Sequence, residues 1–121
     1  MKTLQNQFTS PEKYYTVKKT DTNNNNILLP NILYTQMEYF ATNVILSNTS
    51  IAYPIPQLYK LQLLKNVYTD DTLAFKAQIK KYNELELQLL VDVFQKKDSE
   101  DNSVCKAIFR FNLKEDIPKA S

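Results

Sequence analysis

The side chains of this 121-residue chain that could do chemistry are carboxylates, hydroxyls and amides, because the sequence has no histidine and no glycine. The first absence excludes Ser-His-Asp and Cys-His catalysis and imidazole metal ligands. The second excludes a phosphate-binding P-loop and the dinucleotide fingerprint. Cys105 is the single cysteine, and in the strand-like run SVCKAIFRF we expect it to be a small buried residue. We therefore predict no metal and no cofactor.

Two acids stand out in the segment TDTNNNNILLPNILYTQMEY. Asp21 precedes four asparagines, and Glu38 follows in an apolar, helix-like stretch. A carboxylate in either place could activate water or attack a carbonyl carbon. Each has a plainer interpretation: Asp21 as the acceptor of a turn, and Glu38 as a partly solvated helix residue. Both interpretations stay open on the sequence alone. Asp70 and Asp71 are expected to form a turn.

The elements that must position these acids can be inferred from hydrophobic periodicity. Pro30 to Ser47 is expected to be a helix, because Leu33, Met37, Phe40 and Val44 recur at spacings of four, three and four. Segments with period-two alternation indicate strands. These expected strands are Lys13–Thr20, Leu58–Tyr68, Thr72–Tyr82, Glu84–Lys97 and Val104–Leu113, with KDSEDNS as a polar turn. The asparagine run supplies a turn, since asparagine tolerates left-handed backbone conformations.

Length and charge narrow the class of protein. A chain of this length fits one domain, 1–121, with a core over about 13–113. The net charge of +2 comes without a dense block of Lys and Arg, so nucleic acid is not an expected partner. No apolar run approaches the roughly 20 residues of a membrane-spanning helix, and no secretory signal is evident. We expect a cytoplasmic protein with no membrane partner.

The order of one strand, one long helix and several antiparallel strands is an α+β pattern, and it resembles the hotdog fold. The resemblance lies in LQLLKNVYTDDTLAFKAQIKKYNELELQLLVDVFQKK and SVCKAIFRFNL, and it covers about Tyr14 to Leu113. Asp70-Asp71 stands where that superfamily usually has Gly-Asp. The resemblance implies one long central helix wrapped by a curved antiparallel sheet, as in acyl-CoA thioesterases and 3-hydroxyacyl-ACP dehydratases.

The resemblance also implies roles for particular residues. Against the 4-hydroxybenzoyl-CoA thioesterase branch, Asp21 matches a loop aspartate and Glu38 matches a helix acid, while the usual Gly-His pair falls on Asn26-Ile27. Backbone N–H groups of Asn31, Ile32 and Leu33 would stabilise the oxyanion of a thioester, because Pro30 has no N–H. Tyr34 and Gln36 would line the substrate site. In the dehydratase branch Gln36 replaces the catalytic glutamate.

Three functions follow from these matches. The first is hydrolysis of an acyl-CoA or acyl-ACP thioester with Glu38 or Asp21 as base or nucleophile. The second is a dehydratase-like protein that lacks the usual His/Glu pair, and the third is a non-catalytic acyl-binding or scaffold subunit. The resemblance further implies a homodimer or a dimer of dimers, with the site at the subunit interface.

Overall fold

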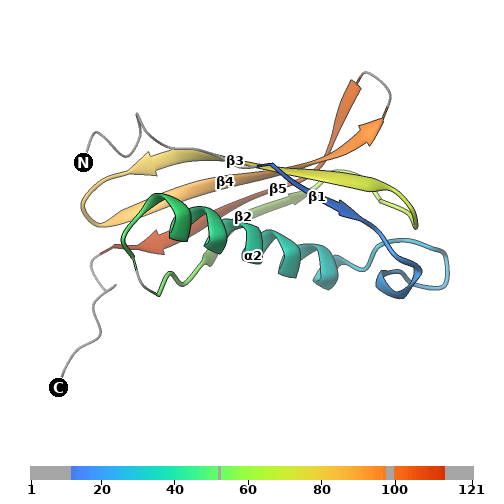
Figure 1. Ribbon diagram of the computed structural model, residues 1–121, viewed down its shortest axis with the longest axis horizontal. Coiled ribbons are helices and arrows are strands. Elements are labelled where there is room, and N and C mark those ends of the chain that lie inside the picture. Colours follow the sequence, from blue (N-terminus) through green and yellow to red (C-terminus); the bar gives the residue numbers. More distant parts are fainter. Residues whose placement is uncertain (1–11, 52, 98–99, 114–121) are drawn as a thin grey trace.

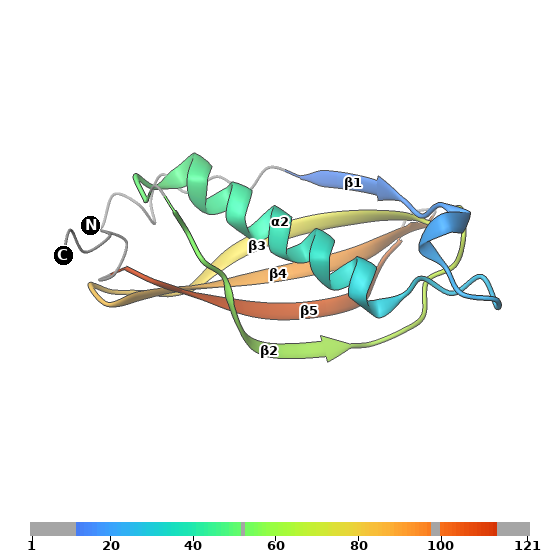
Figure 2. The same ribbon diagram turned by 90° about the horizontal axis from the view of Figure 1, so that it is seen from below.

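The computed structural model describes residues 12–51, 53–97 and 100–113. These residues form one long helix against one face of a five-stranded antiparallel sheet (Figure 1, Figure 2). The elements in chain order are β1 (Lys13–Thr16), the 3₁₀ helix η1 (Lys19–Asp21), α2 (Pro30–Asn48), β2 (Gln57–Leu63), β3 (Thr72–Tyr82), β4 (Glu86–Lys97) and β5 (Glu100–Asn112). The spatial order of the strands is β1-β3-β4-β5-β2, so β1 and β2 are the two edges. The hotdog architecture is confirmed.

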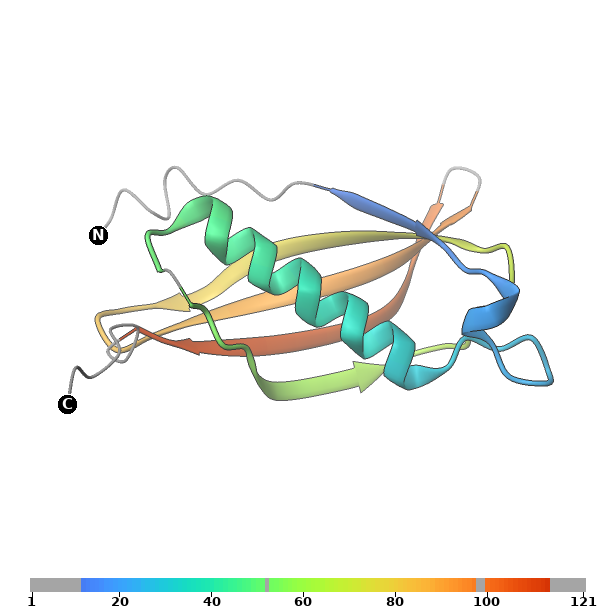
Figure 3. The same ribbon diagram turned by 60° about the horizontal axis from the view of Figure 1, so that its bottom comes forward.

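Helix α2 forms where the apolar spacing predicts it, and it crosses the sheet diagonally (Figure 3). Pro30 occupies its first turn, where a missing N–H costs nothing. The helix ends at Asn48, and the Thr49 backbone N–H and hydroxyl both donate to the Ile45 carbonyl, at 2.9 and 2.8 Å. Its buried face is the predicted stripe extended by two residues: Leu33, Met37, Phe40, Ala41, Val44 and Ile45. None of the helices in the described residues is long and apolar enough to cross a membrane.

The core lies between α2 and the inner face of the sheet. Alternate residues of the central strands point into it, as period-two alternation requires. The Phe40 and Phe75 rings meet there with their centroids 5.7 Å apart. The buried strand residues of this face include Leu73 and Phe75 of β3, Leu87, Leu89, Val91 and Val93 of β4, and Cys105, Ala107, Phe109 and Phe111 of β5.

Three predicted strand boundaries are wrong by more than two residues. The first strand ends at Thr16 rather than Thr20, because the Asp21 side chain turns the following residues into η1. β2 ends at Leu63 rather than Tyr68, since the next two backbone N–H groups converge on a single carbonyl, that of Val104. β5 begins at Glu100, because polar residues continue the ladder with β4. The expected turn KDSEDNS is therefore too long, and residues 98–99 within it lie outside the described residues.

The asparagine run forms a compact loop in front of α2. The Asn23 side-chain oxygen accepts the backbone N–H groups of Asn25 and Ile27, at 2.8 and 3.1 Å. Asn26 has a φ of 65°, and Asp70, in the position of the usual glycine, has a φ of 78°. After glycine, asparagine and aspartate are the residues that tolerate a positive φ best, so both turns form in a chain without glycine. Leu28 then packs into the core.

Candidate functional site

A small hollow separates the β2 side of the helix from the sheet, and we call it the α2–β2 hollow. Its floor is buried and apolar, whereas its rim is exposed on both the helix and the edge strand. A predicted catalytic residue and a predicted substrate-binding residue lie here together. The residues that line the hollow are Tyr34, Met37 and Glu38 of α2, Leu58 and Leu61 of β2, and Ala107 and Phe109 of β5.

Glu38 is exposed at the rim of this hollow, and it is the only charged residue of α2. Its carboxylate has no hydrogen bond or ion pair with any residue in the described part of the chain. Asn31 is seven residues earlier, nearly two full turns, so both residues lie on one side of the helix with Tyr34 between them. The α-carbons of Asn31 and Glu38 are about 10 Å apart along the axis, and helical side chains lean toward the N-terminus.

Asp21 lies in a different environment. Its Oδ2 atom accepts the Tyr15 hydroxyl at 2.5 Å and the Lys18 backbone N–H at 3.0 Å. Burial raises the pKa of Asp21, but these hydrogen bonds and the Lys18 charge outweigh burial and hold the pKa below its usual value. Burial and the Asp21 carboxylate in turn raise the pKa of Tyr15 to about 12. The Asp21 carboxylate thus ties η1 to β1.

The single chain does not bring the two predicted catalytic acids into one site. The Asp21 carboxylate is bonded to Tyr15 on one edge strand, β1, and Glu38 borders residues of the other edge strand, β2. Gln36 also lies on the β1 side, where its Oε1 accepts the Lys13 ammonium at 2.9 Å. Within the described chain, Gln36 is therefore a structural partner of β1 and does not line the α2–β2 hollow.

The predicted oxyanion donors at the start of α2 are partly occupied. The Ile32 and Leu33 N–H groups both donate to the Leu29 carbonyl, at 3.1 and 3.2 Å, and the Leu33 side chain is buried in the core. The prediction that three free donors lie here is wrong for these two. Of the three, Asn31 alone has a backbone N–H without an acceptor in the described residues. Its position at the first turn is where helix N–H groups are unsatisfied.

The remaining sequence predictions concern residues outside the hollow. Cys105 is fully buried, and burial followed by the nearby Asp92 charge raises the pKa of its thiol to about 11, so it is a core residue. Asp70 and Asp71 form the expected turn, in which the Asp71 Oδ2 accepts the Tyr68 N–H at 2.8 Å. No cluster of potential metal ligands occurs in residues 12–51, 53–97 and 100–113.

Sequence reasoning missed the contribution of β2. All seven residues of this strand are exposed, including Leu58 at 51% and Leu63 at 45% of their surface. The signal was present in the sequence as the apolar residues of QLYKLQLL, directly after a loop with two prolines. The pattern indicated a strand, but it did not show that the strand is an edge with an uncovered apolar side.

No protein-family model matches the sequence, and a search of curated proteins gives no match. Solved structures do match. The acyl-CoA hydrolase from Staphylococcus aureus, solved with butyryl coenzyme A, coenzyme A and coenzyme A disulfide, superposes with a TM-score of 0.77 at 15% identity. That match covers 85% of this chain and 64% of the hydrolase, so the present chain spans less than two thirds of its length.

Two further solved structures match over more of their own length. A hypothetical thioesterase from Streptococcus pneumoniae, solved with coenzyme A, gives a TM-score of 0.74 at 19% identity, covering 87% of this chain and 78% of its own. A hexameric thioesterase from Yersinia pestis gives a TM-score of 0.72 at 20% identity, covering 83% of both chains. At these identities the likeness establishes the hotdog fold.

Proposed function

We propose that this protein hydrolyses acyl thioesters, carried by coenzyme A or by an acyl carrier protein, at the α2–β2 hollow. The observation that carries the proposal is the exposed, unpaired carboxylate of Glu38 beside an apolar recess. A carboxylate there is available to water. The hollow itself, at about 20 Å³, has room for little more than a water molecule, so an acyl chain would lie over the exposed leucines of its rim, Leu58 and Leu61. The Asp21 carboxylate already accepts two hydrogen bonds, so we assign Asp21 to loop structure rather than to catalysis.

The reaction requires only groups that the chain supplies. Glu38 takes a proton from a water molecule, and the water oxygen attacks the thioester carbonyl carbon. The carbonyl oxygen gains negative charge, which the Asn31 backbone N–H stabilises at the positive end of α2. The C–S bond then breaks, the thiolate takes up the proton, and a carboxylic acid is released.

The site is completed by a second copy of the chain joined along β2. This seven-residue edge strand has no strand on its outer side within the described chain, and apart from Gln57, Lys60 and Gln62 its exposed side chains are leucine and tyrosine. Such edges pair with other strands unless they are protected. Tyr53, Ile55 and Leu64, which flank β2, are also exposed. Pairing two β2 edges would bury these side chains and close the open side of the α2–β2 hollow. The hexameric Yersinia pestis thioesterase shows that a protein of this fold assembles into multimers.

The solved structures support the choice of substrate class. The Staphylococcus aureus protein is an acyl-CoA hydrolase solved with butyryl coenzyme A, and the Streptococcus pneumoniae thioesterase was solved with coenzyme A. We place the activity in the cytoplasm, where the free thiol of Cys105 would remain reduced. Residues 13–113 would act as one catalytic domain.

The test is thiol release from a panel of acyl-CoAs and acyl-ACPs of increasing chain length. In Glu38→Gln, which keeps the shape of the side chain and removes its charge, kcat should fall by about 10²–10⁴-fold. Glu84→Gln, a change of another exposed acid in the β3–β4 turn, is the matched control and should keep full activity. Asp21→Asn should keep most of the activity in protein that remains folded.

Three outcomes would refute the proposal. Thiol release that survives in Glu38→Gln would exclude Glu38 as the base. Saturable acyl binding without thiol release from any substrate would make the protein an acyl-binding subunit. Hydration of an enoyl thioester in the same panel would instead establish dehydratase-type chemistry.

A further inference from the structure

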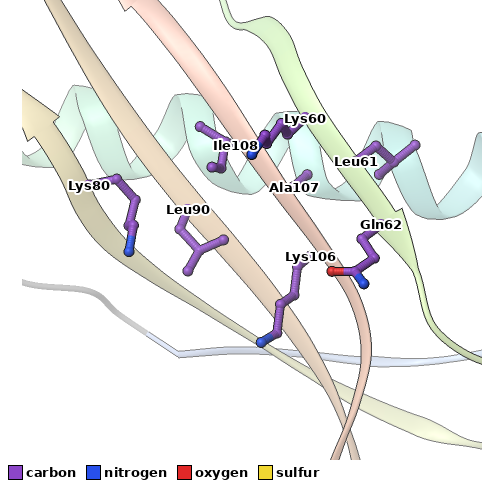
Figure 4. Close-up of a pocket in the computed structure, with 8 residues that line it drawn as sticks. All are labelled: Lys60, Leu61, Gln62, Lys80, Leu90, Lys106, Ala107 and Ile108. Carbon is purple, nitrogen blue, oxygen red and sulfur yellow. The ribbon is translucent and has the colours of Figure 1, made fainter.

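The face of the sheet that points away from α2 carries a second and larger hollow, which we call the outer hollow. It has a volume of about 470 Å³. Figure 4 shows α2 behind the strands and the side chains of Lys80, Leu90 and Lys106 in front of them, so these residues lie on the face of the sheet that points away from the helix. The residues that line it are Lys60, Leu61 and Gln62 of β2, Lys80 of β3, Leu90 of β4, and Lys106, Ala107 and Ile108 of β5.

The floor of the outer hollow is apolar. Leu90 and Ile108 are direct cross-strand partners, and Lys60 pairs with Ile108 in the same row. Both apolar side chains are only partly buried although they lie in the middle strands of the sheet. Most of the surface that the lining residues expose to the hollow is carbon. A pocket of this size with an apolar floor is typical of a site for a small molecule.

The rim of the outer hollow is cationic, and its lysines make no ion pair within the described residues. Elsewhere on this face, Lys76 is paired with Glu12 at 3.4 Å, and Lys81 and Arg110 share Glu86 at 3.0 and 2.9 Å. By contrast, the three lysines of the hollow, Lys60, Lys80 and Lys106, have no carboxylate partner among the described residues.

One acid does lie close to this rim. Asp92 pairs with Lys106 in the β4–β5 register, but its Oδ1 accepts the Ser103 hydroxyl at 2.9 Å. Three cations from three different strands thus surround an apolar floor. The arrangement favours a ligand that supplies both negative charge and an apolar body.

We propose that the outer hollow binds a single-chain anionic amphiphile, with its carboxylate or phosphate head among Lys60, Lys80 and Lys106 and its alkyl chain on Leu90 and Ile108. A second copy of the chain stacked on this face is a poor occupant, since it would bring like charges together. The site is separate from the chemistry of thioester hydrolysis, because neither Glu38 nor Asn31 lines it. Leu61 and Ala107 border both hollows, so these two residues cannot report which one is filled.

The test is a titration of the full, isotopically labelled chain followed by backbone amide NMR shifts. The probes are octanoate, octyl phosphate, octanol and inorganic phosphate, each kept below the concentration at which it forms micelles. Octanoate or octyl phosphate should shift the amides of Leu90, Ile108 and Lys80, and the stronger of the two identifies the head group. Octanol and inorganic phosphate, which each lack one half of the ligand, should bind about tenfold more weakly or not at all.

Substitutions can distinguish binding at the outer hollow from nonspecific attraction of an anion to a positively charged surface. The double change Lys60→Gln and Lys106→Gln should weaken octanoate or octyl phosphate at least about tenfold. Lys76→Gln removes one positive charge from the same face of the sheet and should change affinity less than about twofold, because that lysine is already paired. Ile108→Asn at the floor should also weaken binding, with unfolding by urea as the check on folding.

Several results would overturn the proposal. These are equal affinity for octanol, equal affinity for inorganic phosphate, equal losses in Lys76→Gln and in the double variant, or no binding of any probe. Shifts confined to Tyr34, Glu38 and Leu58 would place the amphiphile in the α2–β2 hollow instead. The Glu38→Gln variant, which is expected to lose hydrolysis, should bind octanoate at the outer hollow unchanged, so failure of one proposal is distinguishable from failure of the other.

Discussion

The polar side chains near the two edges of the sheet differ in whether they have hydrogen-bond partners. On the β1 edge, Asp21 is hydrogen-bonded to Tyr15 and Gln36 is hydrogen-bonded to Lys13, so both of these side chains have partners within the chain. On the β2 edge, Glu38 stands unpaired beside exposed leucines. Satisfied polar groups hold a fold together, whereas an unpaired carboxylate beside uncovered apolar surface is suited to a ligand or a partner. This difference separates the structural acid from the candidate catalytic one.

Among the predicted effects, the largest should come from placing a charge on the β2 edge, where it should weaken association of two chains. Because β2 already carries Lys60, Leu63→Lys places a second ammonium group where two β2 strands are proposed to meet, and lysines on an edge strand oppose pairing. The dissociation constant of the dimer should rise by at least about 100-fold, equivalent to about 2.7 kcal/mol, with a parallel fall in hydrolysis. Sedimentation or light scattering over a concentration series measures it.

The control for this change is Leu85→Lys. Leu85 lies in the β3–β4 turn and is 59% exposed, so the added charge remains in water and association should not change. If Leu63→Lys associates as strongly as the unmodified chain, β2 is not the interface.

Removing the acid of the β1 edge should affect stability rather than activity. Asp21→Asn weakens the acceptor for the Tyr15 hydroxyl and the Lys18 N–H, and hydrogen bonds to charged groups are worth about 1.5–3 kcal/mol each at most. Since the site is partly solvated, we expect a loss of about 1–2 kcal/mol in the free energy of unfolding. Urea denaturation measures this loss. A large fall in kcat with unchanged stability would return Asp21 to the list of catalytic residues.

The hydrogen bond between Tyr15 and Asp21 should make the stability of the fold depend on pH. The folded pKa of Asp21 is lowered, so its contribution is complete above the unfolded pKa of about 3.9 and is lost as the pH falls through the folded value. The folded pKa of Tyr15 is raised to about 12, so its contribution is complete below about pH 10 and is lost between about 10 and 12.

Tyr15→Phe removes the hydroxyl that links these two groups. The variant should therefore lose less stability than the unmodified chain both at acid pH and at alkaline pH. Urea midpoints compared at about pH 7 and about pH 11 test the alkaline side. An identical fall in the midpoint for Tyr15→Phe and the unmodified chain would contradict the assigned role of the hydroxyl.

The smallest effect is expected at the Lys13–Gln36 contact. Gln36→Ala removes one partly buried hydrogen bond from a lysine, and the cost should be about 0.5–1 kcal/mol with no change in hydrolysis. Thermal or urea unfolding measures the stability change. Loss of thioester hydrolysis at unchanged stability would mean that Gln36 contacts the substrate, as the sequence comparison first implied.

The sequence predicted the helix more accurately than it predicted most of the strand ends. The spacing of Leu33, Met37, Phe40 and Val44 requires a helix with one buried face, whatever covers it. The start of β5 was missed because Asn102 and Ser103 are polar residues that read as a turn, yet they lie opposite Gln95 and Phe94 in the ladder. A hairpin can extend past its apolar residues as long as each backbone group finds a partner.

The candidate site was only half predictable. Glu38 and Tyr34 were identified in the sequence, and the structure places both at the α2–β2 hollow. The sequence did not predict that Asp21 and Gln36 are hydrogen-bonded within the chain, because their partners, Tyr15 and Lys13, belong to another element.

By itself, the sequence determined which reactions are impossible and where the helix runs. Composition excludes histidine and glycine chemistry, and local periodicity is a property of neighbouring residues. The tertiary structure alone decided which edge of the sheet leaves its apolar side uncovered and which lysines lack a partner. Those facts depend on contacts between residues far apart in the chain, and such contacts form only when α2 packs diagonally across a sheet of strand order β1-β3-β4-β5-β2.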